Sequence, residues 1–216
     1  WKLQLIDSSG IYGLAVAKTY LEVNPTAKLL ILESANSIGG TWAEHRLYPG
    51  LKTNNMIGTY EFSDFPMDPE TYHLKPGQHI PGPTMHRYLA DYAAHFNLVK
   101  RIRFDAKLES AEHKEGGGWR LKLAAAAKGE RALGGDELFT QKLVLATGLT
   151  SDPFLPKIAG SEIFGAPLFH SKEFPSHEDT LKTAKSVTVF GGTKSAWDAV
   201  YAYASKGVKV DWVIRG

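Results

Sequence analysis

Residues 3–13, Leu-Gln-Leu-Ile-Asp-Ser-Ser-Gly-Ile-Tyr-Gly, join an apolar run to a turn of the pattern S-x-G-x-x-G. The run predicts a buried strand, and residues 11–23 predict a helix that ends before Pro25, because proline disfavours helical geometry in the residue before it. Residues 28–33 (KLLILE) predict a second buried strand. Strand, helix and strand in such a short stretch form a βαβ unit, so we expect a parallel sheet.

The turn itself has the spacing of a dinucleotide-binding turn. In that turn the first glycine makes the bend, the second lets backbone N–H groups approach the pyrophosphate, and the third lets helix and strand pack closely. Gly10 and Gly13 fill the second and third positions, and Ser8 fills the first. If the bend needs a positive φ, the Cβ of Ser8 costs about 1 kcal/mol. Glu33 ends the second strand, where a carboxylate can accept both ribose hydroxyls; the alternative is a solvated strand-end Glu.

A second βαβ unit is predicted over residues 186–214. We expect its turn to bind a nucleotide through Gly191, Gly192, Thr193, Lys194 and Ser195. Thr193 takes the second-glycine position, and Ala196 takes the third. Arg215 ends the following strand, where the first unit has Glu33, and a guanidinium binds a 2′-phosphate that a carboxylate repels. The first unit therefore suits FAD and the second suits NADPH. The alternative for Arg215 is a surface arginine that binds no ligand.

Composition narrows the chemistry. The chain has 216 residues, 43% of them hydrophobic, a net charge of +2 and no cysteine. The absence of cysteine excludes disulfides and thiol redox catalysis. The small net charge indicates no nucleic-acid partner and no binding to an anionic membrane surface. Two nucleotide folds imply a flavin that a pyridine nucleotide reduces, and without a redox cysteine pair the natural electron acceptor is dioxygen. No apolar run approaches a membrane span, and we expect a cytoplasmic location.

The remaining segments complete the expected fold. Residues 34–82 lack long periodicity, as functional loops do, and Thr84 should cap a helix over residues 85–96. We expect an α/β protein: an FAD/NAD(P)-binding Rossmann-like domain with a parallel sheet and a β-meander over residues 1–185, followed by the first βαβ unit of a second Rossmann-like NADPH domain over residues 186–216. The sequence begins at Trp1, and we expect the true N-terminus to lie elsewhere.

Four different short motifs are spread along nearly the whole chain. They are SIGGTW at 37–42, TNN at 53–55 with FSDFP at 62–66, ATG at 146–148, and GGTKSAWD at 191–198. Together they resemble the IGGxW, TN…FSDFP, ATG and GxGxSGxD segments of the flavin-containing monooxygenases, the class B flavoprotein monooxygenases, and especially their fungal-type members.

The fingerprint between the two domains of that family, FxGxxxHxxx(F/Y), is matched in part. Phe164, His170 and Phe174 fit, but Ala166 holds the glycine position and a glycine lies one place early at Gly165. By resemblance His170 supports the domain junction and the placement of the nucleotide. A general base, a metal ligand and a surface histidine are the alternatives.

The resemblance implies a role for each motif. It places Asn54 beside the flavin ring as the catalytic candidate, and it adds further residues to the cofactor site: Gly40, Thr41, Trp42, Leu108, Ala146, Thr147 and Gly148. NADPH would reduce FAD, and the reduced flavin would form a C4a-peroxyflavin with dioxygen. A nitrogen, sulfur or carbonyl of a small molecule would then take one oxygen atom. A truncated, non-catalytic remnant and a Baeyer–Villiger enzyme are the alternative interpretations.

Overall fold

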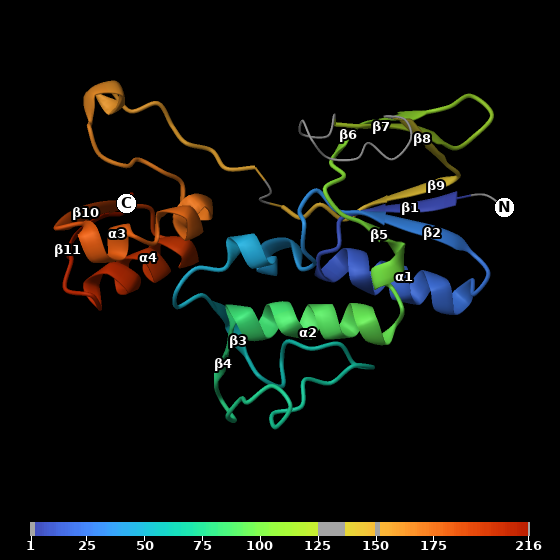
Figure 1. The fold of residues 1–216 in the computed structure, drawn as a ribbon, viewed down its shortest axis with the longest axis horizontal. Helices are drawn as coiled ribbons and strands as arrows, with labels where there is room; N and C mark the ends of the chain where they lie inside the picture. The colour runs from blue at the N-terminus through green and yellow to red at the C-terminus, as the bar shows by residue number, and fades with distance from the viewer. Residues whose placement is uncertain (1–2, 125–136, 150–151, 216) are drawn as a thin grey trace.

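The computed structural model describes residues 3–124, 137–149 and 152–215 (Figure 1). A four-stranded parallel sheet lies at the centre of the first unit, in the order β5-β2-β1-β9. Its strands are β1 (Leu3–Asp7), β2 (Lys28–Leu32), β5 (Ile102–Arg103) and β9 (Lys142–Leu145). The predicted parallel sheet is therefore confirmed.

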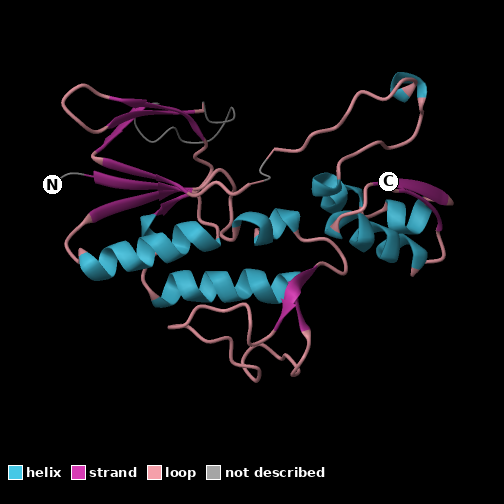
Figure 2. Ribbon diagram, turned by 180° about the vertical axis from the view of Figure 1, so that it is seen from behind, coloured by secondary structure: helices cyan, strands magenta, loops and turns pink. Residues whose placement is uncertain are grey.

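Two helices and a meander cover the two faces of this sheet. Helices α1 (Ile11–Val23) and α2 (Gly82–His95) lie on one face, and the antiparallel meander lies on the other (Figures 1 and 2). The meander runs β6-β7-β8, over Leu108–His113, Trp119–Leu123 and Glu137–Thr140. The prediction of a β-meander is confirmed for these strands; the segment 125–136 lies outside the described residues.

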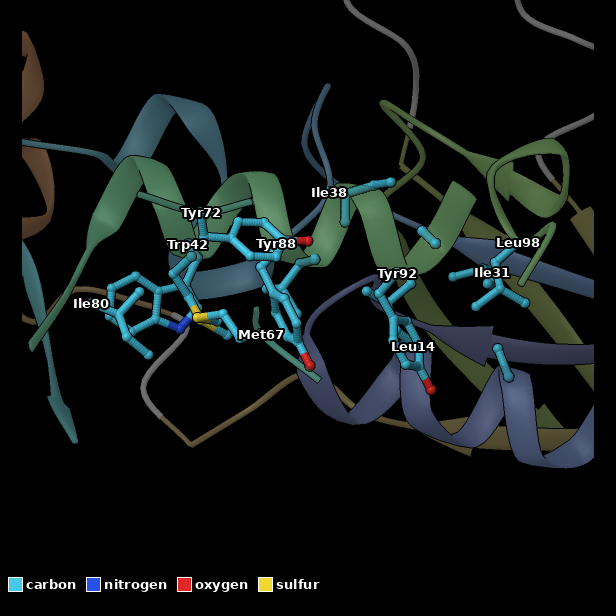
Figure 3. Packing of buried hydrophobic residues seen from close by; sticks show 14 of the residues in the cluster. Leu14, Ile31, Ile38, Trp42, Met67, Tyr72, Ile80, Tyr88, Tyr92 and Leu98 are labelled. Carbon is cyan, nitrogen blue, oxygen red and sulfur yellow. The ribbon is translucent and has the colours of Figure 1, made fainter. Parts of the chain in front are cut away.

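The main core fills the space between the sheet and the two helices. Alternate strand residues such as Ile6 and Ile31 face this side, while Leu5 and Leu32 face the meander. Figure 3 shows the aromatic side of α2, where Tyr88 and Tyr92 are fully buried. Each buried side chain of this size contributes roughly 1.5–3 kcal/mol, so this cluster holds the layers together.

Helix α2 begins at Gly82, three residues before the predicted start at residue 85. Thr84 lies inside its first turn and does not cap it, so the capping prediction is wrong. Gly82 and Pro83 form the start of the helix, because the fixed φ of proline suits a first turn whose N–H groups have no partner in the helix. The Gly82 N–H donates to Leu51 O over 2.8 Å, and this bond fixes where the helix begins.

Short elements fill the long loop and the connections. They are the 3-10 turns η1 (Gly40–Trp42), η2 (Glu44–Arg46), η3 (Val99–Arg101) and η4 (Ser161–Ile163), and the hairpin of β3 (Lys52–Met56) with β4 (His79–Pro81). Figure 1 shows η1 and η2 between the carboxyl ends of β1 and β2 and the second unit. Ligands of open parallel sheets bind at such carboxyl edges.

The second unit is a βαβ unit, as predicted. Strand β10 (Ser186–Phe190) pairs in parallel with β11 (Lys209–Val213), and α4 (Lys194–Ala204) connects them. The 3-10 segment η5 (Ser171–His177) and the short helix α3 (Thr180–Thr183) pack onto it through Phe174 and Leu181. The packing thus groups η5 and α3 with the second unit, although the sequence analysis assigns them to the first domain.

Candidate dinucleotide-binding site

The first turn is held in a strained conformation at Ser8. Its φ is 104°, a value that glycine adopts freely and that costs a serine about 1 kcal/mol. The Ser8 N–H donates to Leu32 O over 2.7 Å, which ties the turn to β2. The Ser8 hydroxyl oxygen accepts from the Gly10 N–H over 3.1 Å. The serine therefore offsets part of the strain by engaging one N–H that would otherwise point to a ligand.

Close backbone contacts explain Gly13 in this turn and Gly40 in η1, which packs on it. A Cβ on Gly13 would lie 1.9 Å from Ser8 O, and a Cβ on Gly40 would lie 3.1 Å from the Cα of Gly10. Gly39 also donates its N–H to Ser9 O over 3.2 Å. The segment that begins at Gly39 thus packs backbone to backbone on the turn, and no side chain lies between the two at Gly10 and Gly40.

The N-terminus of α1 is suited to an anion. The first turn of the helix contains no acidic residue, and Gly10 provides no side-chain cap. The first N–H groups of a helix carry a partial positive charge and have no partner within the helix. A pyrophosphate fits this end, because it supplies acceptors to N–H groups that the turn leaves open.

Glu33 is buried, with 5% of its surface exposed, so it is not the solvated strand-end glutamate of the alternative interpretation. One carboxylate oxygen accepts from the Ser9 N–H over 2.9 Å and from the Ser9 hydroxyl over 2.7 Å. The other accepts from the Ala35 N–H over 3.0 Å and from the Ser34 hydroxyl over 3.4 Å. The two backbone bonds fix the carboxylate beside the turn, and the buried Ser9 hydroxyl adds a third donor.

A second carboxyl lies below the same turn. Burial raises the pKa of Asp7 to about 6, and the charge of Glu33 adds to the shift. An acid whose pKa rises on folding destabilises the folded state above that pKa, so Asp7 costs stability at neutral pH. The two carboxyls make this edge negative, except where the helix N-terminus and nearby cations offset them.

The second turn repeats the geometry of the first. Gly191 has a φ of 124° and donates its N–H to Val213 O over 3.0 Å, as Ser8 does to Leu32. Helix α4 begins after Thr193, which provides no side-chain cap, and no acidic residue lies in its first turn. The Trp212 indole N–H donates to Gly191 O over 2.6 Å. The predicted second nucleotide turn therefore has the backbone that such a turn needs.

The strand register corrects the position of Arg215. Val213 in the second unit pairs with Phe190 as Leu32 pairs with Asp7 in the first, so the counterpart of Glu33 is Ile214. Arg215 lies one residue further along and is exposed. The prediction that Arg215 occupies the position of Glu33 is wrong by one residue, because the pairing of β11 with β10 sets which residue follows the strand.

A hydrogen bond joins the two units. The Tyr48 hydroxyl donates to a carboxylate oxygen of Asp198 over 2.7 Å, and Lys194 forms an ion pair with the same oxygen. Burial and this bond raise the pKa of Tyr48 above its usual range, which keeps the donor protonated. The Tyr48 ring packs on Phe174 with 5.5 Å between centroids. Local sequence patterns did not single out Tyr48, because its partner lies 150 residues away.

In the IGGxW and ATG motifs, some residues pack in the core and others contribute backbone contacts near the first turn. Trp42 is buried among the core residues, near Met67 and Ile80 (Figure 3), while Thr41 is exposed. Ala146 donates its N–H to Asp7 O over 3.1 Å, and Gly148 has a φ of 80°. These segments lie at the carboxyl ends of β1 and β9, beside the first turn.

Leu108 belongs to the meander rather than to this edge. It is the first residue of β6 and packs, half-buried, against the cluster that contains Leu5 and Leu121.

The TNN and FSDFP motifs differ in their roles. Thr53 is buried, and its hydroxyl donates to Asn55 O over 2.6 Å, whereas Asn54 is exposed on β3. Phe62 packs on Tyr92 with 4.1 Å between centroids, and Asp64 forms an ion pair with Lys18 of α1. FSDFP therefore fixes the loop to the helices, whereas Asn54 and Asn55 of the TNN motif are both exposed on β3.

His170 has a capping role at the junction. Its Nδ1 accepts from the Lys172 N–H over 3.1 Å, and its own N–H donates to the Glu173 carboxylate over 3.2 Å. These two bonds form a capping box that begins η5. Phe174, three residues into η5, is buried in the core of the second unit, whereas Phe164 is exposed.

The described residues contain neither a membrane-spanning helix nor a metal-binding cluster. In the part of the chain that the structure describes, no helix is long and apolar enough to cross a membrane. Within the same residues, no group of three or more His, Asp or Glu could hold a metal ion.

The fold and the two turns define a protein with two dinucleotide-type βαβ units, and comparison with known proteins gives its family. The family model described as L-lysine 6-monooxygenase/L-ornithine 5-monooxygenase matches residues 72–216. The FAD-dependent monooxygenase resA of Aspergillus sclerotiorum is 39% identical over 98% of this chain. The chain therefore belongs to the flavin-containing monooxygenase family.

Solved structures show the same fold. Tmm from Pelagibacter matches 99% of this chain and 51% of its own length, with a TM-score of 0.79 and 20% identity. OTEMO, in complex with FAD and NADP, matches 99% of this chain and 39% of its own, with a TM-score of 0.76 and 21% identity. The chain spans 36% of the length of resA, a little over a third.

Proposed function

We propose that the protein is an FAD- and NADPH-dependent monooxygenase that transfers one oxygen atom from dioxygen to a nitrogen, sulfur or carbonyl of a small molecule. One observation carries this proposal: the chain contains two strand–turn–helix units with the same backbone geometry. Ser8 and Gly191 both have a strongly positive φ, and both donate an N–H to the neighbouring strand. Two nucleotide-type turns in one chain suit a flavin and the nucleotide that reduces it.

The residues of the first unit fit FAD. A pyrophosphate would bind at the N-terminus of α1, where Gly10 presents no side chain, and the carboxylate of Glu33 would accept from the ribose hydroxyls. When bound, the flavin would take a hydride from the nicotinamide and activate dioxygen. The protein would hold the two nucleotides and exclude water; Asn54 would hydrogen-bond at the reacting edge of the ring.

The test of this function is direct. The purified full-length protein should be yellow, show a flavin absorption spectrum, and oxidise NADPH with uptake of dioxygen. A colourless protein that binds no added FAD would contradict the proposal and favour a non-catalytic relative. Products formed from amines, thioethers and ketones would then separate nitrogen or sulfur oxygenation from Baeyer–Villiger chemistry.

Arg215 should select NADPH over NADH. Arg215→Ala removes the cation that a 2′-phosphate contacts, and it leaves the NADH contacts in place. We expect the Michaelis constant for NADPH to rise roughly tenfold, from the loss of one charge-assisted contact, and that for NADH to stay within twofold. Steady-state oxidation of both nucleotides measures this. Equal use of NADH and NADPH by the unmutated protein would contradict the role of Arg215 in binding the 2′-phosphate.

Asn54 should keep the reaction coupled. Asn54→Ala removes an exposed amide, so the variant should fold, bind FAD and consume NADPH at nearly unchanged rates. Without its hydrogen bond at the flavin edge, product should fall and hydrogen peroxide should rise. The measurement is peroxide released per NADPH consumed, at equal flavin content. Asn55→Ala, on the adjacent exposed position of β3, is the matched control. An unchanged ratio would mean that Asn54 has no part in the chemistry.

A further inference from the structure

The guanidinium of Arg46 contains a buried donor without a hydrogen-bond acceptor. Its Nε atom is buried and has no hydrogen-bond partner, and among the ion pairs of the described residues none includes Arg46. A buried donor without a partner costs about 1–3 kcal/mol, and more when it is charged. Such a group is retained where a ligand completes it, so Arg46 marks a place for an acceptor.

The position of Arg46 indicates which ligand could reach it. It ends η2, four residues after Trp42, and its N–H donates to Ala43 O over 2.9 Å. Gly40, at the start of the same segment, packs on Gly10 of the first turn. Figures 1 and 2 both show this segment between the carboxyl edge of the sheet and the second unit. Arg46 therefore belongs to the segment that packs on the first turn and extends toward the second unit.

The charges around Arg46 favour an anion. Lys172, from η5 of the second unit, has its pKa lowered by burial and then by Arg46, and the same two causes lower the pKa of His45. Arg46 acts on both groups, so three cationic side chains lie near one another, and an anion among them would be stabilised. The acidic groups that face them are Asp152, which acts on Lys172, and Glu33, which acts on His45.

We propose that Arg46, assisted by Lys172, binds a phosphate group of the dinucleotide that lies between the two units. The inference rests on the proposed function and deepens it, because it adds a phosphate contact outside both glycine turns. The fork of the guanidinium can donate two parallel hydrogen bonds to phosphate oxygens, including one from the Nε–H that now has no partner. The phosphate belongs either to the FAD pyrophosphate or to NADP, and binding measurements separate these two sources.

The experiment compares Arg46→Met, Arg46→Lys and Arg87→Met in the full-length protein, with FAD and NADP+ titrated separately. Arg46→Met should weaken one of the two ligands roughly ten- to hundredfold, as expected for the loss of a charged hydrogen bond. Arg46→Lys should recover only part of this loss, because lysine keeps the charge and lacks the fork. Arg87, an exposed arginine on α2 paired with Asp91, controls for the loss of a positive charge.

Thermal unfolding without ligand gives the second readout. Arg46→Met removes an unsatisfied buried donor and keeps an apolar stem, so its unfolding temperature should stay equal or rise. A fall in FAD affinity assigns the contact to FAD, and a fall in NADP+ affinity assigns it to NADP. If both affinities stay within twofold of the Arg87→Met control, or if the unfolding temperature falls, the inference is overturned. If the unmutated protein binds neither ligand, the proposed function fails with it.

Discussion

Gly13→Ala should prevent the first turn and α1 from packing as they do in the native protein. The added methyl carbon would lie 1.9 Å from Ser8 O and 2.9 Å from Ser8 C, and both are backbone atoms that cannot rotate away. The helix would have to shift away from β1, which opens the core around Leu14 and Ala17. We expect a loss of about 4 kcal/mol or more in the free energy of unfolding, at the upper end for a single substitution.

Urea unfolding followed by circular dichroism measures this loss. Gly10→Ala is the matched control in the same turn, because a Cβ there would come no closer than 3.4 Å, to the Ser8 hydroxyl. That variant should fold with nearly native stability, while its methyl group should hinder the approach of a pyrophosphate. If Gly13→Ala unfolds at the same urea concentration as the unmutated protein, helix α1 does not approach the turn as closely as the structure shows.

Glu33→Gln should weaken both the fold and the binding of FAD. The amide keeps the shape of the side chain, but its nitrogen cannot accept a hydrogen bond. At least one of the Ser9 and Ala35 backbone N–H groups then loses its acceptor. A buried N–H without a partner costs about 1–3 kcal/mol, which thermal or urea unfolding of the ligand-free protein should show. The matched control is Glu137→Gln on β8, where the carboxylate is exposed.

Comparison of FAD with FMN isolates the ribose contact of Glu33. FMN lacks the adenosine ribose, so its affinity should stay within twofold, whereas FAD affinity should fall roughly tenfold when ribose hydrogen bonds are lost. Both titrations are made at a temperature where the variant is fully folded. Equal losses for the two flavins would give Glu33 a purely structural role in the turn.

Local sequence was sufficient to predict most elements. The residue spacing predicted α1 and β10 with the bounds that the structure has, because an apolar face of a given period must be buried whatever its neighbours are. The spacing of glycines likewise located both nucleotide turns. The prediction failed for the start of α2, where the bond from Gly82 to Leu51, a residue outside the helix, selects the first turn.

The environment of each candidate site residue depended on the tertiary structure. The sequence named Glu33, but only the packed turn shows that Ser9 and Ala35 fill its carboxylate oxygens. The sequence analysis predicted that Arg215 is the structural equivalent of Glu33. The strand register shows that Ile214, one residue earlier, is the equivalent residue. Strand period is a local property, whereas register follows from which residues pair across the sheet.

By itself, the sequence determined that this protein has two βαβ units, a meander and two dinucleotide turns, because periodicity and glycine spacing act within a few residues. Only the tertiary structure decided that Tyr48 bonds to Asp198, and that Arg46 lies between the units with a buried donor unmet. These contacts join residues far apart in the chain. Their energies depend on distance, burial and partner geometry, which exist only once the layers have packed.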